Sequence, residues 1–249
     1  MKRNFLVKDK IVVVTGAAKG NGKAIADGFV DAGSIVYYLD LLESVLENIN
    51  RDKTGRSIAK VIDITNNDEI FNYINNIEHI DILINNAGVA LPVDKINLNQ
   101  NWNKTLEVNL TSLYNVSRYV AEKMKQSGGG SIINITSISS FLGSSGNPSY
   151  HASKGAVKYL TRSFAADYGK YNIRVNNVCP GYIETEMTQK SYKDLQKRKM
   201  ISKRTMLGRW GKSEDLIGAC IFLGSDESLY ITGSDLLVDG GLINKGLDI

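Results

Sequence analysis

Short apolar runs alternate with longer amphipathic stretches along most of this 249-residue chain. The runs are rich in valine and isoleucine, as in "IVVVT" at 11–15, and glycine or polar residues flank them, which is typical of buried strands. The longer stretches repeat apolar residues every three or four positions, as a helix with one buried face does. We predict strands at 11–15, 34–39, 57–62, 80–84, 131–136, 173–178 and 235–238, and helices at 21–32, 41–50, 67–78, 99–126, 149–170 and 213–224.

The regular alternation of strand and helix predicts an α/β fold. Strands that are continuous apolar runs are buried on both faces, so their sheet is expected to be parallel and covered by helices on each side. Because crossovers between parallel strands are right-handed, the expected architecture is a doubly wound sheet of about seven strands. No linker rich in proline, glycine or serine divides the chain, which has only 3 prolines, so residues 1–249 are expected to form a single domain.

Composition limits the possible classes of protein. With 43% hydrophobic and 22% charged residues and a net charge of +4, the chain is typical of a soluble globular protein. Its two cysteines, Cys179 and Cys220, lack metal-binding spacing, and His79 and His151 are its only histidines, so no metal site is expected. Isolated thiols suit a reducing compartment, and we expect a cytoplasmic protein. No apolar stretch approaches the ~18–20 residues that a membrane helix needs, so no membrane partner is expected.

Positive charge is concentrated in one stretch, "KSYKDLQKRKMISKR" at 190–204. Such a stretch could contact an anionic substrate or nucleic acid. The favoured interpretation is a solvated helix face, and no nucleic-acid partner is expected.

The first predicted strand leads into a glycine-rich loop, "TGAAKGNG" at 15–22. Gly16 permits a tight turn, Gly20 lets the backbone approach a phosphate, and Gly22 lets the next helix pack close to the strand. The helix N-terminus then offers unpaired N–H groups to a pyrophosphate. Asp40 ends the next strand-like run 20 residues after Gly20, at the spacing of an acid that binds the adenosine ribose. The pattern predicts a Rossmann-type dinucleotide site; glycines serving only a tight turn are the simpler alternative.

Two charged residues favour different dinucleotides. Lys19, inside the loop, suits the 2′-phosphate of NADP, whereas Asp40 accepts hydrogen bonds from the ribose hydroxyls of NAD. A carboxylate beside a 2′-phosphate would meet ~−2 charge, at a cost of at least ~1 kcal/mol. Lysine is flexible and can turn to solvent or pair with a carboxylate, Asp40 itself being one candidate. NAD is therefore the predicted cofactor, with NADP the less favoured one.

A second polar group is expected at the carboxyl end of the sheet. Tyr150 and Lys154 are four residues apart in a predicted helix and so share one face, and Ser137 follows the strand at 131–136. Nearby positive charge from Lys154 and an oxidised nicotinamide is expected to favour the phenolate of Tyr150. An alcohol would lose its proton to Tyr150 and its hydride to the cofactor, while Ser137 holds the developing oxyanion.

With these motifs in place, the chain resembles the short-chain dehydrogenase/reductase family from about residue 8 to 241. The motifs occur in the family's order, and Ser137 stands 13 residues before Tyr150, as the family spacing requires. The matching segments are "TGAAKGNG", Asp40, "DIT" at 63–65, "NNAG" at 85–88, "EVNL" at 107–110, Ser137, "YHASK" at 150–154, "CPGYIETEM" at 179–187 and "YITGSDLLVDGG" at 230–241.

The resemblance implies a role for each matching position. Tyr150 corresponds to the catalytic acid/base, Ser137 to its substrate-orienting partner, and Lys154 to the lysine that also binds the nicotinamide ribose. Asn109 corresponds to the asparagine that positions a water in a proton relay, although an ordinary polar helix residue is the alternative. Asp63 would contact adenine or cap the next helix. The implied cofactor-binding residues are Gly16, Lys19, Gly20, Asn21, Gly22, Asp40, Asp63, Ile64, Asn86, Gly88, Tyr150, Lys154, Ile183 and Thr185.

One position departs from the family. An apolar residue usually lies between the last two loop glycines, and here it is Asn21. Its side chain could bind a phosphate or cap the helix, so no loss of cofactor binding is expected.

Substrate and assembly are constrained only by the resemblance. A lid at about 188–210 would close over the crevice, and its basic residues hint at an anionic substrate. A polyol, sugar, sugar acid or hydroxyacyl compound is expected; an NADPH-dependent 3-oxoacyl-carrier-protein reductase is the alternative. A non-catalytic dinucleotide-binding protein is a third possibility, which the full set of catalytic residues disfavours. The segment 230–241 resembles the strand through which family members form homotetramers.

Overall fold

The computed structural model describes residues 6–43, 49, 55–91 and 98–246. Seven parallel strands form one sheet in the order β3-β2-β1-β4-β5-β6-β7. This confirms the predicted single α/β domain with a doubly wound sheet. The strands are β1 (Ile11–Thr15), β2 (Ile35–Asp40), β3 (Ser57–Val61), β4 (Ile82–Asn85), β5 (Gly130–Ile135), β6 (Ile173–Pro180) and β7 (Asp235–Val238).

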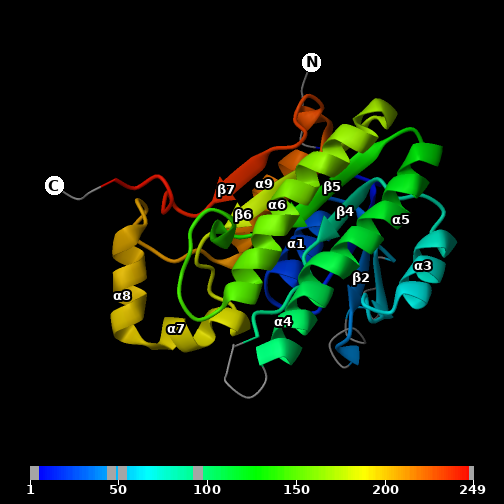
Figure 1. Ribbon diagram of the computed structural model, residues 1–249. Helices are drawn as coiled ribbons and strands as arrows, with labels where there is room; N and C mark the ends of the chain where they lie inside the picture. Colours follow the sequence, from blue (N-terminus) through cyan, green and yellow to red (C-terminus); the bar gives the residue numbers. More distant parts are fainter. Residues whose placement is uncertain (1–5, 44–48, 50–54, 92–97, 247–249) are drawn as a thin grey trace.

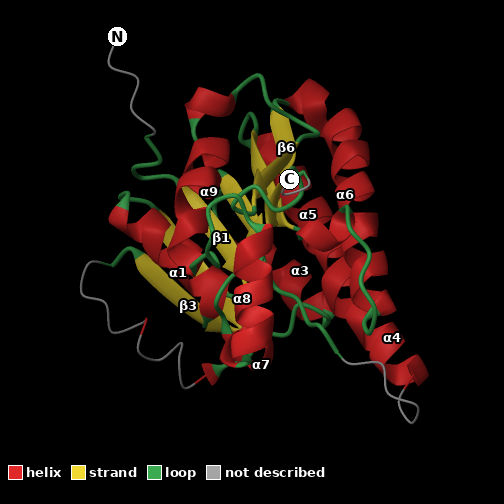
Figure 2. Ribbon diagram, turned by 90° about the vertical axis from the view of Figure 1, so that its left-hand side faces the viewer, coloured by secondary structure: helices red, strands yellow, loops and turns green. Residues whose placement is uncertain are grey.

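Helices cover both faces of the sheet, with α1 and α9 on one side and α3, α5 and α6 on the other (Figure 2). They are α1 (Gly20–Asp31), α3 (Asn67–Asn76), α4 (Leu98–Leu106), α5 (Ser112–Gln126), α6 (Pro148–Tyr168), α7 (Gln189–Lys193), α8 (Leu195–Arg204) and α9 (Ile217–Gly224). The predicted helix at 41–50 falls mainly outside the described residues.

The pleat of β1 shows why this strand is a continuous apolar run. Val12 and Val14 pack into the core beneath α1 and α9, whereas Val13 packs into the core beneath α3 and α5. All three are completely buried. Because successive side chains point to opposite faces, a strand covered on both sides needs apolar residues at every position.

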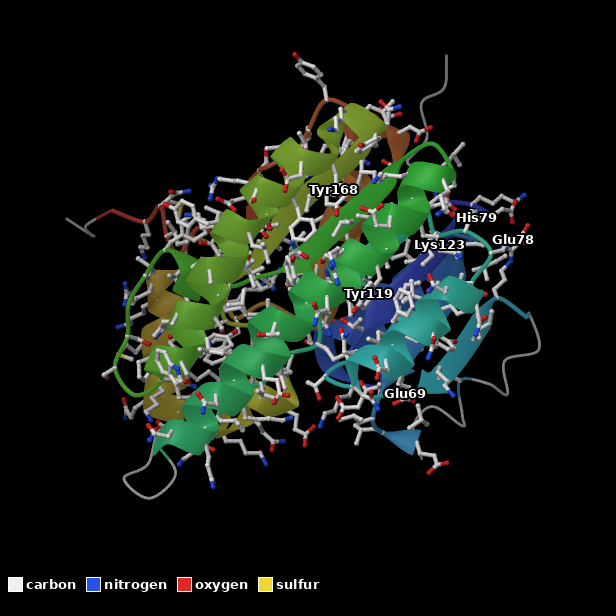
Figure 3. All side chains as sticks on the ribbon, turned by 45° about the vertical axis from the view of Figure 1, so that its right-hand side comes forward. Glu69, Glu78, His79, Tyr119, Lys123 and Tyr168 are labelled. Carbon is white, nitrogen blue, oxygen red and sulfur yellow. The ribbon has the colours of Figure 1, made fainter. Side chains whose placement is uncertain are left out.

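The face formed by α3, α5 and α6 is also held by polar contacts (Figure 3). The Tyr119 hydroxyl donates to Asn67 Oδ1 at 2.6 Å, and Lys123 Nζ donates to the backbone oxygen of Asn75 at 2.9 Å. Both bonds join α5 to α3. The next contact joins α6 to α5, where the Tyr168 hydroxyl donates to Glu122 Oε1 at 3.3 Å.

The predicted helix at 99–126 is interrupted. A π-helical turn at Glu107–Thr111 separates α4 from α5, so the helix gains an extra residue at the level of Asn109. Apolar spacing continues through the turn and gives no sign of it. Single π-turns inside helices are frequent at functional sites, and this one places Asn109 at the cleft described below.

The basic stretch 190–204 forms most of α7 and α8, which stand apart from the two helix layers at one end of the molecule (Figure 1). Within these two fully described helices Ile201 is the single buried residue. A solvated helix face is exposed in this way, but a nucleic-acid contact would need the same exposure, so the absence of that partner stays a prediction. No helix among the described residues has both the length and the apolar character needed to cross a bilayer.

Candidate active site

A cavity of about 410 Å³ opens where the strands β1, β2, β4, β5 and β6 end. The strand order reverses between β1 and β4, which is where ligands bind in doubly wound sheets. The cavity brings together most of the predicted site residues, both those expected at the adenosine end of a dinucleotide and those expected at its nicotinamide end. Those in its wall are Gly16, Lys19, Gly20, Asn21, Asp40, Asp63, Ile64, Asn86, Gly88, Ser137, Tyr150, Lys154, Ile183 and Thr185.

The glycine loop is as tight as its sequence predicts. Gly16 has φ +66°, and a Cβ there would lie 2.7 Å from the Cα of Ala87. At Gly22, behind the cavity wall, a Cβ would lie 2.1 Å from the backbone oxygen of Gly16. Gly20 differs because it has φ +56° but faces open space, with Thr185 3.7 Å from the position of a Cβ. The loop therefore leaves room for a ligand beside Gly20 alone.

The N-terminus of α1 fits an anionic group. Among the described residues no side chain caps this helix, and its first turn contains no acid. By contrast, Asn66 caps α3 and Asn147 caps α6 through side-chain hydrogen bonds. The first N–H groups of α1 and its partial positive charge thus remain for the pyrophosphate of a dinucleotide.

Asp40 is fixed at the end of β2. Its Oδ2 accepts a hydrogen bond from the N–H of Ala18 at 2.9 Å, and its Oδ1 accepts from the N–H groups of Leu41 and Leu42 at 2.7 and 3.2 Å. A carboxylate has about four acceptor positions, so about one remains for a ligand hydroxyl. The carboxylate therefore belongs to the loop as well as to the cavity.

Lys19 pairs with Glu186 rather than with Asp40, the partner considered from the sequence. Glu186 begins a short helical turn at Glu186–Thr188, which follows β6. Both residues line the cavity, so the pair joins the glycine loop to this turn. Sequence reasoning did not identify Glu186 because 167 residues separate the two partners.

The other polar residues of the loop have structural partners. Asn21 Oδ1 accepts a hydrogen bond from the Ser213 hydroxyl at 2.9 Å, so the unusual asparagine ties the loop to the segment before α9. Asn86 Nδ2 donates to the backbone oxygens of Thr15 and Gly16 at 3.1 and 2.9 Å. Asn86 thereby clamps the end of β4 to the end of β1.

At the side of the cavity predicted for adenine, Asp63 and Ile64 line the wall beside Thr65. Burial raises the pKa of Asp63, but hydrogen bonds from the N–H and hydroxyl of Thr65 outweigh this effect, so the pKa is lowered overall. The alternative role of Asp63 as a helix cap is wrong, because Asn66 caps α3 by accepting from the N–H of Glu69. Asp63 shapes the loop that precedes the cap.

Tyr150 and Ser137 meet on the opposite side of the cavity. The ring of Tyr150 is half-buried at the start of α6, and its hydroxyl forms a hydrogen bond with Ser137. Burial of the hydroxyl raises the pKa of Tyr150, and the bond with Ser137 lowers it only in part. In the protein alone, burial thus outweighs the expected lowering of this pKa, because desolvation disfavours the phenolate. Tyr150 is a neutral phenol, ready to donate a proton.

Lys154 lies one helical turn from Tyr150, with its Nζ 5.8 Å from the centroid of the tyrosine ring. The Nζ donates to the backbone oxygen of Ile135 at 2.8 Å. Burial lowers the pKa of Lys154 to about 8. A lysine with this pKa can hold or release a proton near neutral pH, which suits the relay that the family resemblance implies.

Asn109 is completely buried behind Lys154 and Gly88. Its Oδ1 accepts from the N–H of Val89 at 2.8 Å, and its Nδ2 donates to the Val89 backbone oxygen at 2.9 Å and to the Ser153 hydroxyl at 3.1 Å. These bonds fix the π-turn to α6 and to the loop after β4. Asn109 thus links three elements of the site, while its part in a proton relay stays a prediction.

Two further hydrogen bonds hold α6 in place. Thr161, in the middle of the helix, accepts from Asn134 Nδ2 of β5 at 2.8 Å and donates to Asn177 Oδ1 of β6 at 2.7 Å. Both partners are buried. The helix that carries Tyr150 and Lys154 is thus attached to the two strands beneath it.

Other lining residues were not identified from the sequence. They include Lys104 of α4, which forms an ion pair with Glu107 at 3.3 Å, and Met187, which is exposed beside Glu186. Lys104 lies outside the matching segments, and Met187 ends the segment 179–187 without having been singled out as a site residue. Their positions depend on how α4 and the turn after β6 fold over the crevice.

Comparisons with known proteins agree with this site. A family model described as enoyl-(acyl carrier protein) reductase matches residues 16–243. Gluconate 5-dehydrogenase of Gluconobacter oxydans is 36% identical over 248 residues, covering 96% of each chain. NAD-dependent glycerol dehydrogenase of Listeria innocua is also 36% identical and covers 98% of this chain and 97% of its own. The structure of gluconate 5-dehydrogenase from Burkholderia cenocepacia, in complex with NADP and tartrate, has a TM-score of 0.91 and 34% identity over 97% of this chain and 98% of that one.

The similarity covers the whole cavity, from the glycine loop to the strand after the basic helices. Fold, motif order and site geometry lead to one family. The chain belongs to the short-chain dehydrogenase/reductase family, and it is an oxidoreductase that acts on CH–OH groups with a nicotinamide dinucleotide.

Proposed function

We propose that the protein is an NAD-linked dehydrogenase of a small polar secondary alcohol, such as a polyol, a sugar or a sugar acid. The observation that carries the proposal is one cavity with a carboxylate, Asp40, at one end and the Ser137–Tyr150–Lys154 group at the other. The relatives named gluconate 5-dehydrogenase and glycerol dehydrogenase support this class of substrate.

Each part of the cavity would hold one part of the dinucleotide, which supplies or accepts the hydride. The loop and the open N-terminus of α1 would bind the pyrophosphate, and Asp40 would accept a bond from the adenosine ribose. The residues that would hold the adenine are Asp63 and Ile64, and those around the nicotinamide end are Asn86, Gly88, Lys154, Ile183 and Thr185.

Proton transfer is the task of the protein. In ketone reduction the neutral Tyr150 donates its proton to the carbonyl oxygen while Ser137 donates a hydrogen bond to the same oxygen. In alcohol oxidation Tyr150 must accept a proton, and the positive charge of Lys154 stabilises the phenolate that precedes this step. The proton that Tyr150 accepts must then leave for solvent, and Lys154, whose pKa of about 8 lets it release a proton near neutral pH, would pass it on while Asn109 holds the adjoining turn in place.

The preference for NAD rests on Asp40. A 2′-phosphate at the ribose would carry ~−2 charge beside a fixed carboxylate, at a cost of at least ~1 kcal/mol. Lys19, the cation that could offset this cost, is engaged by Glu186. The NADP in the Burkholderia structure supports the opposite preference, so the two dinucleotides must be compared directly.

The test is a panel of polyols, sugar acids and hydroxyacyl thioesters, each assayed with NAD and with NADP. Turnover of a polyol or sugar acid with NAD is expected. Turnover of the thioesters alone, with NADPH, would support the carrier-protein reductase instead. Asp40→Asn keeps the size of the side chain and is expected to raise the use of NADP; a wild type that already prefers NADP would contradict the role given to Asp40.

The role of Tyr150 has a matched control on the same helix. Tyr150→Phe is expected to lower kcat by ~10²–10⁴, the usual contribution of a general acid or base. Tyr159→Phe, a change at a side chain that is 71% exposed, is expected to leave kcat unchanged. Full turnover by Tyr150→Phe would show that Tyr150 is not the acid/base, whereas a wild type that binds the dinucleotide but turns over no alcohol would support a non-catalytic binding role.

Three wider features belong to the same proposal. Residues 188–210, with α7 and α8, would act as a lid over the substrate end. A homotetramer is proposed from the segment 230–241, and light scattering after size exclusion tests it, a monomer being the contrary result. A cytoplasmic location is proposed because Cys179 and Cys220 are free and buried, as suits a reducing compartment.

A further inference from the structure

We propose that Glu186 is a specificity-determining residue, which keeps the protein selective for NAD by engaging Lys19. The inference rests on the proposed binding of a dinucleotide in this cavity. It assigns to Glu186 a role that neither the glycine loop nor the catalytic residues reveal. Lys19 and Glu186 form an ion pair, and both line the wall of the cavity.

The contact is built from two segments that the fold brings together. Lys19 is the residue before α1, and Glu186 is the residue after Thr185. These segments are close at the neighbouring position too, since a Cβ at Gly20 would lie 3.7 Å from Thr185 Cγ2. The lysine and the glutamate therefore face each other across a narrow gap.

Lys19 can also reach the group that Asp40 binds. The N–H of Ala18 donates to Asp40 Oδ2 at 2.9 Å, and Lys19 is the next residue, about 3.8 Å away along the backbone. Its four-carbon side chain is long enough to turn either toward Glu186 or toward a group beside Asp40. A 2′-phosphate beside Asp40 would thus compete with Glu186 for the same ammonium group.

The pair is weak enough for such a competition to matter. The side chains of Lys19 and Glu186 are 57% and 68% exposed, and water screens such ion pairs. Breaking an exposed pair usually changes an equilibrium by about two- to fivefold. Glu186 also repels phosphate groups directly, and the 2′-phosphate gives NADP more negative charge to repel; the double variant described below separates this effect from that of the lysine. The preference for NAD over NADP comes from Lys19, because Glu186 engages the ammonium group that a 2′-phosphate would need.

The experiment compares Glu186→Gln with Glu184→Gln, a matched change two residues away. Glu184 is exposed and, among the described residues, stands outside the cavity lining. Dissociation constants for NAD and NADP are measured by calorimetry, and kcat/KM is measured with both. We expect Glu186→Gln to shift the NADP-to-NAD affinity ratio by about two- to fivefold toward NADP. Glu184→Gln is expected to leave the ratio unchanged.

A double variant tests the route of the effect. In Lys19→Met/Glu186→Gln the gain in NADP affinity is expected to vanish, because no cation remains to bind the 2′-phosphate. A gain that persists in the double variant would overturn the proposal, as would equal tightening of both dinucleotides by Glu186→Gln. A wild type that binds dinucleotides but turns over no alcohol would refute the proposed function and leave the binding test of Glu186 intact.

Discussion

Replacing Gly22 with alanine introduces one methyl group where the structure has no space for it. Its Cβ would lie 2.1 Å from the backbone oxygen of Gly16 and 2.3 Å from Asn86 Nδ2. These two atoms are hydrogen-bonded to each other at 2.9 Å, so neither can move without breaking the clamp between β1 and β4. Overpacking of a core typically costs about 1–3 kcal/mol, and the lost bond about 1 kcal/mol more.

Gly22→Ala is therefore expected to lower the free energy of unfolding by about 2–4 kcal/mol, which for a chain of this size lowers Tm by about 5–15 °C. Calorimetry checks this value, and titration with NAD checks the accompanying loss of affinity. The matched control is Gly218→Ala in α9, where nothing lies within 4 Å of the new Cβ. That change is expected to be neutral or to stabilise by up to about 1 kcal/mol. Equal melting temperatures for the two variants would refute the close packing of the loop.

Two further variants separate stability from function. Lys154→Met is expected to abolish turnover but to raise Tm at pH 7, because burial lowers the pKa of Lys154 from 10.5 to about 8. Between pH 8 and 10.5 the unfolded wild type binds more protons than the folded wild type, so the free energy of unfolding of the wild type rises with pH. The Tm advantage of Lys154→Met is therefore expected to shrink over this range. The same Tm advantage at pH 7 and at pH 10 would contradict the burial of a charged lysine. Asn21→Ala removes the bond from Ser213 and is expected to lower the free energy of unfolding by about 0.5–1.5 kcal/mol. Its dissociation constant for NAD is expected to stay within twofold of wild type, and a larger loss would mean that Asn21 binds the phosphates.

The strands were predictable because the central ones, such as β1 and β4, are buried on two faces and the outer ones, β3 and β7, are still short runs rich in apolar residues. β1 and β7 begin and end where the apolar runs do, and the other strands differ from the prediction by one to two residues at either end. The π-turn around Asn109 could not be predicted, since an extra residue in a helix leaves the spacing of apolar residues almost unchanged. The helices α7 and α8 lie in the predicted lid, but a stretch this basic has too few apolar residues to reveal their boundaries.

Site residues in local motifs were predictable, and those that depend on distant contacts were not. The glycines and Asp40 belong to one strand–loop–helix–strand unit, so their spacing alone brings them together. Glu186 meets Lys19 only after β6 has been placed beside β5. Burial of the Tyr150 hydroxyl, which raises its pKa, could not be read from the sequence; the lowering expected from Lys154 together with an oxidised nicotinamide stays a prediction for the enzyme with its cofactor.

The open N-terminus of α1 has a consequence for the stability of the protein and its resistance to proteolysis. A helix that lacks a side-chain cap leaves backbone donors for the pyrophosphate, so the bound dinucleotide serves as the missing cap. A ligand at 100 times its Kd adds about 2.7 kcal/mol to the free energy of unfolding. Resistance to proteolysis is then expected to follow the supply of the dinucleotide, and adding NAD to the purified protein is expected to slow its digestion by a protease.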